Sequence, residues 1–373
     1  MKSLQECRAD IDRIDAELLK LLTERMEVAE NVARYKLAND LPVFDDARER
    51  AVLDKIGAKS PELLRTELVG TWDGIMNMSK LRQYIVKSEV AGEVRIEGEK
   101  IPVNPGKIGV QGVPGSFSSK AASEMFPDEK PDYYPTFQLL FDALDNGEVD
   151  CAIVPLENSI HGTVTEVYAQ LLSHDCSIVR AHPVVISHCL LGIPGAKISE
   201  ITKVLSHEQA LGQCAKYIKD HDFEPVNMVN TATAAKHVRD EKNPQQAAIA
   251  SAECAKIYNL EIIDSDIQNS KRNLTRFGAV RRHNVICDGA NKVSLSFTLA
   301  HREGTLARVL AYFSALGLNL TKIESSPIPE KPFEYRFYLD FVGNLTDCAT
   351  SELISALSKE ISGFRLFGNY CEE

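Results

Sequence analysis

The chain has 373 residues, of which 44% are hydrophobic and 25% charged, so an ordinary globular composition supplies apolar side chains for two or three domains. Its 53 acidic residues outnumber 42 basic ones, and the net charge of −11 disfavours nucleic acid as the main partner. No apolar run approaches the ~18 residues of a membrane span, and the charged first segment does not resemble a signal peptide. Nine scattered cysteines without a C-x-x-C pair argue against structural zinc or a disulfide framework and favour a cytoplasmic protein.

Residues 1–90 have a helical pattern throughout. Apolar residues recur at alternating spacings of three and four along a seam that extends to Val32, and the first proline is Pro42. This pattern predicts one long helix with a coiled-coil-like seam, a short helix after Pro42, and a third helix over Pro61–Val86. The stretch 91–105 holds two glycines and two prolines without periodicity and is predicted to be a linker.

Short apolar strands alternate with helix-like runs from residue 107 to about residue 281, which is typical of an α/β domain. We predict strands at residues 107–110, 151–155, 184–187, 203–206, 226–230 and 247–251.

Polar residues follow three of these strands, at Glu157–Ser159, Ser206–His207 and Asn230–Thr231. Ligands of open α/β sheets bind beyond the carboxyl ends of strands, so several such residues at one cleft are candidate binding residues, although each one alone is better explained as a helix cap or turn residue. The loop 112–118 could present backbone N–H groups to an anion, but it has neither the dinucleotide fingerprint nor the P-loop pattern. Neither NAD nor ATP is therefore expected.

A polar break at 281–291 precedes a third unit. Strand-like runs at 292–300, 320–324, 334–342 and 364–367 alternate with helices after Gly304 and at 351–360. The order βαββαβ predicts a ferredoxin-like α+β fold.

Arg25 occupies the seam position that follows Leu21, where a buried guanidinium needs an anionic partner. A structural ion pair or a position at the rim would explain it, but Arg8 and Lys36 lie on the same flank and favour a bound small anion. Arg8 and Arg25 are roughly 25 Å apart along a helix at ~1.5 Å per residue, so one ligand can contact both only if a second chain contributes Arg8. The unpaired seam also needs a partner, and both observations predict an intertwined dimer.

Residues 1–90 resemble the all-helical class of chorismate mutases. The resemblance implies that chorismate rearranges to prephenate without a covalent intermediate, so that positioning and electrostatics suffice. It implies that the partner's Arg8 and Arg25 bind the carboxylates, that Lys36 and Gln83 donate to the ether oxygen, and that Glu49 holds the ring hydroxyl. The matching positions that we expect to bind chorismate are Arg8, Arg25, Lys36, Asp45, Arg48, Glu49, Ser79 and Gln83.

Residues 106–282 resemble prephenate dehydratase. The motifs that carry this resemblance are GVPGSFS, the ENS-x-x-G run from Glu157 to Gly162, SHEQALGQC, NTATAA and the closing Thr275-Arg276-Phe277. The family implies two α/β lobes similar to a periplasmic binding protein. It also implies that prephenate loses its ring hydroxyl as water and its ring carboxylate as CO₂, giving phenylpyruvate without metal or cofactor.

The dehydratase reaction needs a proton donor at the leaving hydroxyl. Thr275 is the first candidate for polarising that hydroxyl and Glu157 is a possible acid, whereas Arg276 could either pair with a carboxylate or serve structure. The expected prephenate-binding residues are Asn158, Ser206, His207, Gln213, Thr231, Thr275, Arg276 and Phe277.

Residues 291–373 resemble an ACT domain, a βαββαβ module that binds amino acids. The resemblance implies feedback inhibition by phenylalanine, although the matching elements could also be turns that only form the fold. Free N–H groups at a helix start favour a carboxylate. Ser326 stands where the family usually has arginine. The expected phenylalanine-binding residues are Gly304, Thr305, Leu306, Glu324, Ser325, Ser326 and Pro327.

The three resemblances divide the chain into 1–90, 106–282 and 291–373. Together they predict a bifunctional enzyme that acts on chorismate and prephenate, is a homodimer or larger homo-oligomer, is inhibited by phenylalanine, and uses no cofactor or metal. A metabolite sensor without catalysis is the alternative from another class, and arogenate is an alternative substrate of the central domain.

Overall fold

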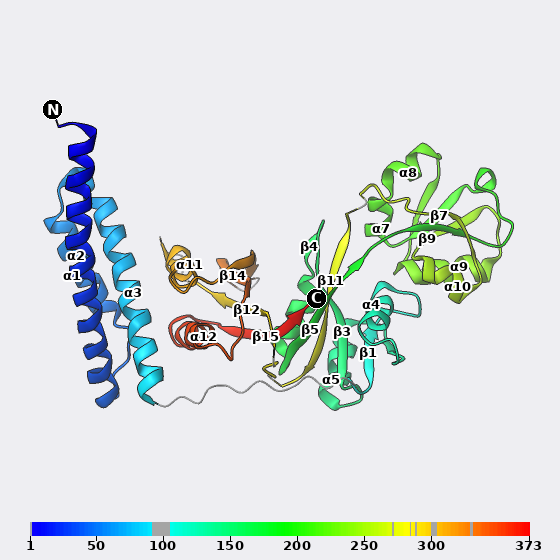
Figure 1. The fold of residues 1–373 in the computed structure, drawn as a ribbon. Coiled ribbons are helices and arrows are strands. Elements are labelled where there is room, and N and C mark those ends of the chain that lie inside the picture. The colour runs from blue at the N-terminus through cyan, green and yellow to red at the C-terminus, as the bar shows by residue number, and fades with distance from the viewer. Residues whose placement is uncertain are drawn as a thin grey trace. The chain divides into compact units, whose positions relative to one another are not determined.

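The computed structural model describes residues 2–91, 105–270, 272–283, 285–287, 289–299, 304–328 and 331–373. The chain forms two compact units (Figure 1). One unit comprises Met1–Glu97 and Lys292–Leu366, and the other comprises Gly98–Asn291 and Phe367–Glu373. The predicted linker at 91–105 falls almost wholly outside the described residues.

The first unit begins with the three predicted helices. They are α1 (Leu4–Ala38), α2 (Asp46–Lys59) and α3 (Arg65–Ala91), and the 3-10 turn η1 (Glu62–Leu64) precedes α3. Ser3 starts α1 with a capping box, because its side chain accepts from the backbone N–H of Glu6 and the Glu6 carboxylate accepts from that of Ser3. Asp45 caps α2 by accepting from the backbone N–H of Arg48 at 3.0 Å.

The apolar seam of α1 is largely exposed within this chain. Ala29 and Ala33 are the described residues of α1 that are buried, and α1 contacts α3. The large apolar side chains of the seam remain between 39% and 69% exposed, and they are Leu4, Ile11, Ile14, Leu18, Leu21, Val28 and Val32.

The C-terminal part of the chain has the predicted βαββαβ order, and this unit includes it as far as Leu366 in the last strand. Its elements are β12 (Lys292–Thr298), α11 (Thr305–Ala315), β13 (Leu320–Ile328), β14 (Lys331–Val342), α12 (Cys348–Glu360) and β15 (Arg365–Glu372). Strand β14 pairs antiparallel with both β12 and β13. Helices α11 and α12 lie between this sheet and α3 (Figure 1).

The N-terminal helices and the βαββαβ module share a core. Leu81 of α3 is buried in the cluster that Val293, Phe297 and Leu353 form in the module. Tyr84 of α3 packs with Ala356 of α12 in a smaller cluster. Sequence regions at opposite ends of the chain therefore form one compact unit.

The second unit has two α/β lobes, as the sequence predicts. The sheet of the first lobe has the strand order β5-β11-β3-β1-β2, in which β11 runs antiparallel to both neighbours. Its elements are β1 (Ile108–Gln111), α4 (Phe117–Met125), β2 (Asp132–Tyr134), α5 (Phe137–Asn146), β3 (Cys151–Asn158), β4 (Gly162–Thr163), α6 (Thr165–Ser173), β5 (Cys176–Val185) and β11 (Leu274–Arg282).

The sheet of the second lobe has the strand order β10-β6-β9-β7-β8. The chain enters this lobe after β5 and returns from it into β11, so two segments connect the lobes (Figure 1). Its elements are β6 (Cys189–Gly192), η2 (Ile198–Glu200), β7 (Lys203–Ser206), α7 (Glu208–Gln213), α8 (Ala215–Asp220), β8 (Glu224–Asn227), α9 (Thr231–Glu241), β9 (Gln246–Ala250), α10 (Ala252–Tyr258) and β10 (Glu261–Asp264).

Several strands differ from their predicted bounds. Strand β5 covers Cys176–Val185 rather than 184–187, and β8 covers Glu224–Asn227 rather than 226–230. Strands β13 (Leu320–Ile328) and β15 (Arg365–Glu372) extend beyond the predicted 320–324 and 364–367. Polar side chains such as Arg180 and His182 interrupt the apolar pattern of β5. This strand is formed because β11 pairs with it along its whole length.

Among the described residues, no helix is both long enough and apolar enough to cross a membrane. Eight of the nine cysteines are free thiols, and the side chain of the ninth, Cys348, lies outside the described residues.

Candidate active sites

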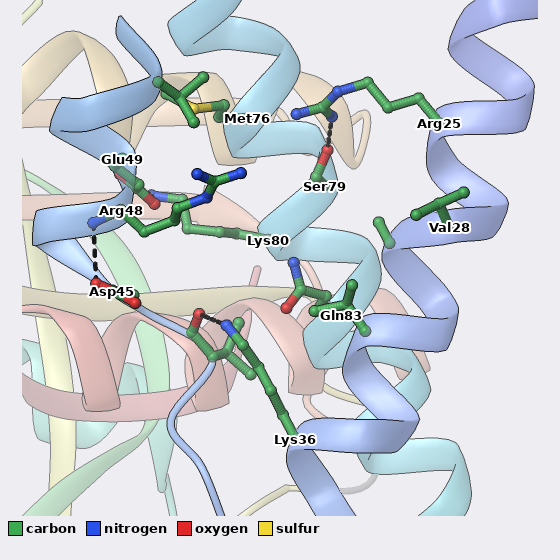
Figure 2. A pocket seen from close by; sticks show the side chains of 14 residues that line it. Arg25, Val28, Lys36, Asp45, Arg48, Glu49, Met76, Ser79, Lys80 and Gln83 are labelled. Atoms are coloured by element: carbon green, nitrogen blue, oxygen red, sulfur yellow. Dashed lines mark hydrogen bonds and ion pairs between the residues drawn. The ribbon is translucent and has the colours of Figure 1, made fainter. Parts of the chain in front are cut away.

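A cavity of about 360 Å³ lies among α1, α2 and α3 (Figure 2). It brings together seven of the eight polar positions that the sequence predicts to bind chorismate. The eighth, Arg8, is exposed near the start of α1 and does not line it. The lining residues are Arg25, Val28, Ala29, Val32, Lys36, Val43, Asp45, Arg48, Glu49, Val52, Met76, Ser79, Lys80 and Gln83.

Arg25 reaches from α1 to α3. Its guanidinium donates to the hydroxyl of Ser79 and, at 3.3 Å, to the carbonyl of Ile75, and the Ser79 hydroxyl donates to the same carbonyl at 2.9 Å. Burial lowers the pKa of Arg25 from its ordinary value. No carboxylate neutralises this guanidinium among its described contacts, so one end of the cavity presents a positive charge to a ligand.

Lys36 and Gln83 lie together at the other end of the cavity (Figure 2). The ammonium of Lys36 donates to the carbonyl of Val43 at 2.6 Å. Burial lowers the pKa of Lys36, while the carboxylates of Asp45 and Glu49 act in the opposite direction. Gln83 is 8% exposed, and within the described structure its buried Oε1 has no hydrogen-bond partner. A neutral donor and a cationic donor can therefore act on one ligand atom.

Lys80 is a buried cation of the cavity that the sequence analysis did not identify. Its side chain is 4% exposed, and its ammonium lies 3.0 Å from Oε1 and 3.3 Å from Oε2 of Glu49. The ammonium also lies 5.2 Å from the ring centroid of Phe44 and 5.9 Å from that of Tyr312. Its place three residues before Gln83 was the available signal, since residues at that spacing are neighbours on a helix.

The cavity therefore has cations at several points and few carboxylates. Arg25, Lys36 and Arg48 are cations, Lys80 is paired with Glu49, and apolar residues from all three helices form the remaining wall. A small ligand with more than one negative charge and an apolar ring complements such a lining.

A second group of predicted residues meets where the last residues of β3 pair with the first residues of β11. Asn158 donates to the hydroxyl of Thr275 at 2.9 Å and to Oδ1 of Asn273 at 2.7 Å. The Oδ1 of Asn158 accepts from the backbone N–H groups of Ile160 and His161. Thr275 is 7% exposed. Asn158 therefore fixes the Thr275 hydroxyl and the following turn in one arrangement.

Arg276 is held by two carboxylates. Its guanidinium lies 2.9 Å from Glu157 in the neighbouring strand and 2.9 Å from Glu372 in the last strand of the chain. Two ion pairs favour the structural alternative for Arg276 and leave less of its charge for a ligand. Phe277 is 2% exposed and belongs to the core of the first lobe.

Three predicted residues of the second lobe lie where strands end and helices begin. The buried Ser206 hydroxyl donates to the carbonyl of Ile249 at 2.6 Å, and His207 caps α7 through Nδ1, which accepts from the backbone N–H of Gln209. Thr231 begins α9. These contacts fit the cap and turn interpretation that the sequence left open.

Gln213 of α7 connects the two lobes. It makes side-chain hydrogen bonds to Nε2 of His161 at 3.1 Å and to Nε2 of His188 at 2.8 Å. Burial lowers the pKa of His188, and Gln213 opposes that shift. The sequence analysis named neither histidine, although His161 lies within the ENS-x-x-G run. Gln213 and His161 place a second-lobe side chain beside the turn that Asn158 holds.

The loop after β1 is fixed to α10. Gly115 has φ +86°, and a Cβ there would lie 2.7 Å from Sγ of Cys254, so only glycine fits. The carbonyl of Gly115 accepts from the hydroxyl of Ser251 at 2.9 Å, and that of Pro114 accepts from the hydroxyl of Tyr258. The loop joins the lobes by these contacts.

The predicted phenylalanine-binding residues lie on two elements of the βαββαβ module. Gly304, with φ +76°, precedes α11, and Thr305 and Leu306 form its first turn. The run from Glu324 to Pro327 lies on β13. Ser326 pairs in register with Arg336 of β14, so a guanidinium lies on the strand beside the position where arginine is usual.

Two families match the chain. Residues 7–84 match chorismate mutase type II, and residues 108–285 match prephenate dehydratase. Arogenate dehydratase/prephenate dehydratase 1 of Arabidopsis thaliana is 35% identical over 280 residues, which are 71% of each chain.

Similarity also extends over the full length and to solved structures. The bifunctional chorismate mutase/prephenate dehydratase of Aquifex aeolicus is 29% identical over 373 residues, 99% of this chain and 98% of that protein. The structure of prephenate dehydratase from Arthrobacter aurescens in complex with L-Phe is 27% identical, with a TM-score of 0.65 over 71% of this chain and 89% of that chain. The chain therefore belongs to the prephenate dehydratase family, and its N-terminal match places it among the bifunctional chorismate mutase/prephenate dehydratases.

Proposed function

We propose that the cavity among α1, α2 and α3 is the chorismate mutase site and that the ends of β3 and β11 form the dehydratase site. Family membership makes the chain an enzyme with both activities, which sets aside a sensor without catalysis. The observation that carries the first assignment is that one cavity collects seven polar positions from three helices.

In the mutase site, Arg25 binds a carboxylate of chorismate, and Lys36 and Gln83 donate to the ether oxygen. Negative charge develops on that oxygen as its bond to carbon breaks, so donors fixed in a partly buried site stabilise the transition state more than the ground state. Glu49 accepts from the ring hydroxyl. Asp45, Arg48 and Ser79 complete the polar lining.

The site is completed by a second copy of the chain, which supplies Arg8. The exposed seam of α1 supports this dimer, since its large apolar side chains from Leu4 to Leu21 are 45–69% exposed in one chain. A helix with such a seam packs against another apolar seam.

In the dehydratase site, Thr275 polarises the ring hydroxyl that leaves as water, and Asn158 orients the Thr275 hydroxyl. Glu157 is the candidate acid, held in place by Arg276 at 2.9 Å. His161 and Gln213 extend the polar surface on the second-lobe side. Arogenate remains the alternative substrate, because a 35% identical relative is named for both substrates.

The βαββαβ module serves as an ACT-type site for phenylalanine, with the amino-acid carboxylate at the start of α11. Its element order and the L-Phe complex of the Arthrobacter dehydratase support this role. Bound phenylalanine inhibits the dehydratase, so the enzyme slows when phenylalanine has accumulated.

A coupled assay tests these assignments. The full chain is given chorismate, and prephenate and phenylpyruvate are followed with and without phenylalanine, in wild type, Thr275→Ala and Thr275→Ser. Wild type forms phenylpyruvate and phenylalanine slows it. Thr275→Ala accumulates prephenate because the hydroxyl is lost, and Thr275→Ser recovers part of the second step. Full dehydratase activity in Thr275→Ala contradicts the role of Thr275. If the central domain turns over arogenate faster than prephenate, arogenate replaces prephenate as its substrate.

A further inference from the structure

Helix α11 of the βαββαβ module contacts the wall of the mutase cavity from behind. Arg308 and Tyr312 are four residues apart on α11 and therefore lie on one face of it. Nη1 of Arg308 lies 4.0 Å from Oε2 of Glu49, and Nη2 lies 3.5 Å from Oδ1 of Asp73. The ring of Tyr312 lies beside the ammonium of Lys80 at 5.9 Å. The same face of α11 thus reaches both members of the Glu49–Lys80 pair.

Glu49 lies between two cations with different surroundings. Lys80 is almost fully buried, whereas the Arg308 side chain is 31% exposed, and Glu49 itself is 13% exposed. A partly exposed ion pair contributes little to the free energy of unfolding because solvent screens it. Its charge still acts on the orientation of a neighbouring carboxylate, and Oε2 of Glu49 lies 4.0 Å from Nη1 of Arg308 and 3.3 Å from Nζ of Lys80.

The contact face of α11 is fixed in the module. Tyr312 is 2% exposed, and its hydroxyl donates to Oε2 of Glu360 on α12 at 3.0 Å. Burial and the Glu360 carboxylate raise the pKa of Tyr312, so the hydroxyl remains a donor at every pH at which the enzyme works. Tyr84 of α3 is held by the same carboxylate. Arg308, one helical turn from Tyr312, therefore projects from a part of α11 that these contacts hold in place.

We propose that Arg308 is a positioning residue of the chorismate mutase reaction. It holds the Glu49 carboxylate in the orientation that faces the ring hydroxyl of the substrate, together with Lys80, which contacts both carboxylate oxygens. Through Arg308, the C-terminal module thereby orients a residue of the mutase site from outside the cavity. Arg308 lies on α11, the helix whose first turn is the proposed phenylalanine site. This inference rests on the role given to Glu49 in the proposed function.

The test compares full-length Arg308→Gln and Arg308→Lys with the control Lys359→Gln, which removes an exposed cation of the same module. Because the pair orients a binding group, Arg308→Gln should raise the KM for chorismate by about three- to tenfold and change kcat by less than about twofold. Arg308→Lys should recover part of the affinity, and Lys359→Gln should match wild type. Partial unfolding of a variant would lower its kcat for chorismate at an unchanged KM, so a raised KM with little change in kcat distinguishes a positioning role from lost folding.

The same substitution in a Glu49→Gln background shows whether Arg308 acts through Glu49. If it does, Glu49→Gln alone raises the KM, and adding Arg308→Gln raises it no further. An unchanged KM in Arg308→Gln, or equal rises in both backgrounds, would overturn the inference and leave the role of Glu49 intact. A wild-type KM in Glu49→Gln alone would instead overturn the role of Glu49 in the proposed function, together with the inference that depends on it.

Discussion

At the scale of single residues, the proposed mutase cavity is defined by cations that are held without full neutralisation. Arg25 is fixed by a hydroxyl and a carbonyl, and Lys36 by a carbonyl. Hydrogen bonds to neutral groups orient a cation and leave its charge available to a ligand. Glu49 and Lys80, in contrast, neutralise each other at one side of the cavity.

Replacing Lys36 by glutamine should lower the kcat of the mutase by about 100-fold and change the KM much less, because the lost donor acts on charge that develops in the transition state. Lys55→Gln, an exposed lysine of α2, is the matched control. Steady-state kinetics with chorismate measures both constants. A kcat within about twofold of wild type would contradict the role of Lys36.

The pH profile of the mutase follows from the same residue. Burial lowers the pKa of Lys36, so its donor is lost as the pH rises through a value below the ordinary lysine range. The kcat of wild type should therefore fall on the alkaline side, and Lys36→Arg should move that fall to higher pH because guanidinium stays protonated. A profile that does not move in Lys36→Arg would assign the alkaline fall to another group.

At the scale of elements, α1 combines a pocket wall and an exposed seam on one helix. The spacing of three and four predicted both the helix and its need for a partner. Strand β5 shows the opposite case. Its Arg180 and His182 hide the strand from a pattern search, and only its pairing with β11 makes the segment a strand.

Charge placed in the seam should separate the proposed dimer. Leu18→Glu introduces a carboxylate at a seam residue that is 50% exposed in the single chain, and Leu63→Glu places the same charge at an 88% exposed residue outside the seam. Sedimentation should show a monomer for Leu18→Glu and a dimer for wild type and Leu63→Glu. Mutase activity should fall with the dimer, because Arg8 of the second copy is lost, while dehydratase activity remains. A dimeric Leu18→Glu would place the interface elsewhere.

At the scale of the whole molecule, the two compact units do not follow the order of the sequence. The N-terminal helices and the C-terminal module share buried side chains, of which Leu81 is one, whereas the two lobes form a unit of their own. Cooperative unfolding follows shared cores, since a cluster loses its packing as one body.

A cavity mutation in each core should therefore affect different activities. Leu81→Ala removes a buried side chain and should lower the free energy of unfolding by about 2–5 kcal/mol. It should lower the temperature at which mutase activity and the binding of phenylalanine to the C-terminal module are lost together. Leu140→Ala, at a fully buried position of the first lobe, should lower the temperature at which dehydratase activity is lost. Activity remaining after graded heating measures both. A shift of all activities by the same amount in both variants would contradict separate units.

The sequence by itself determined the three helices, the α/β region and the βαββαβ order, because these depend on periodicity within single elements. Its resemblance to known families indicated the two lobes and most of the polar positions of the proposed mutase cavity. The tertiary structure alone decided that Lys80 pairs with Glu49, that Arg276 is shared by Glu157 and Glu372, and that Arg308 reaches the mutase site. Each of these ion pairs joins charged side chains from different elements, and most of the paired residues are far apart in the chain. Burial and packing bring such residues together, and no local spacing records it.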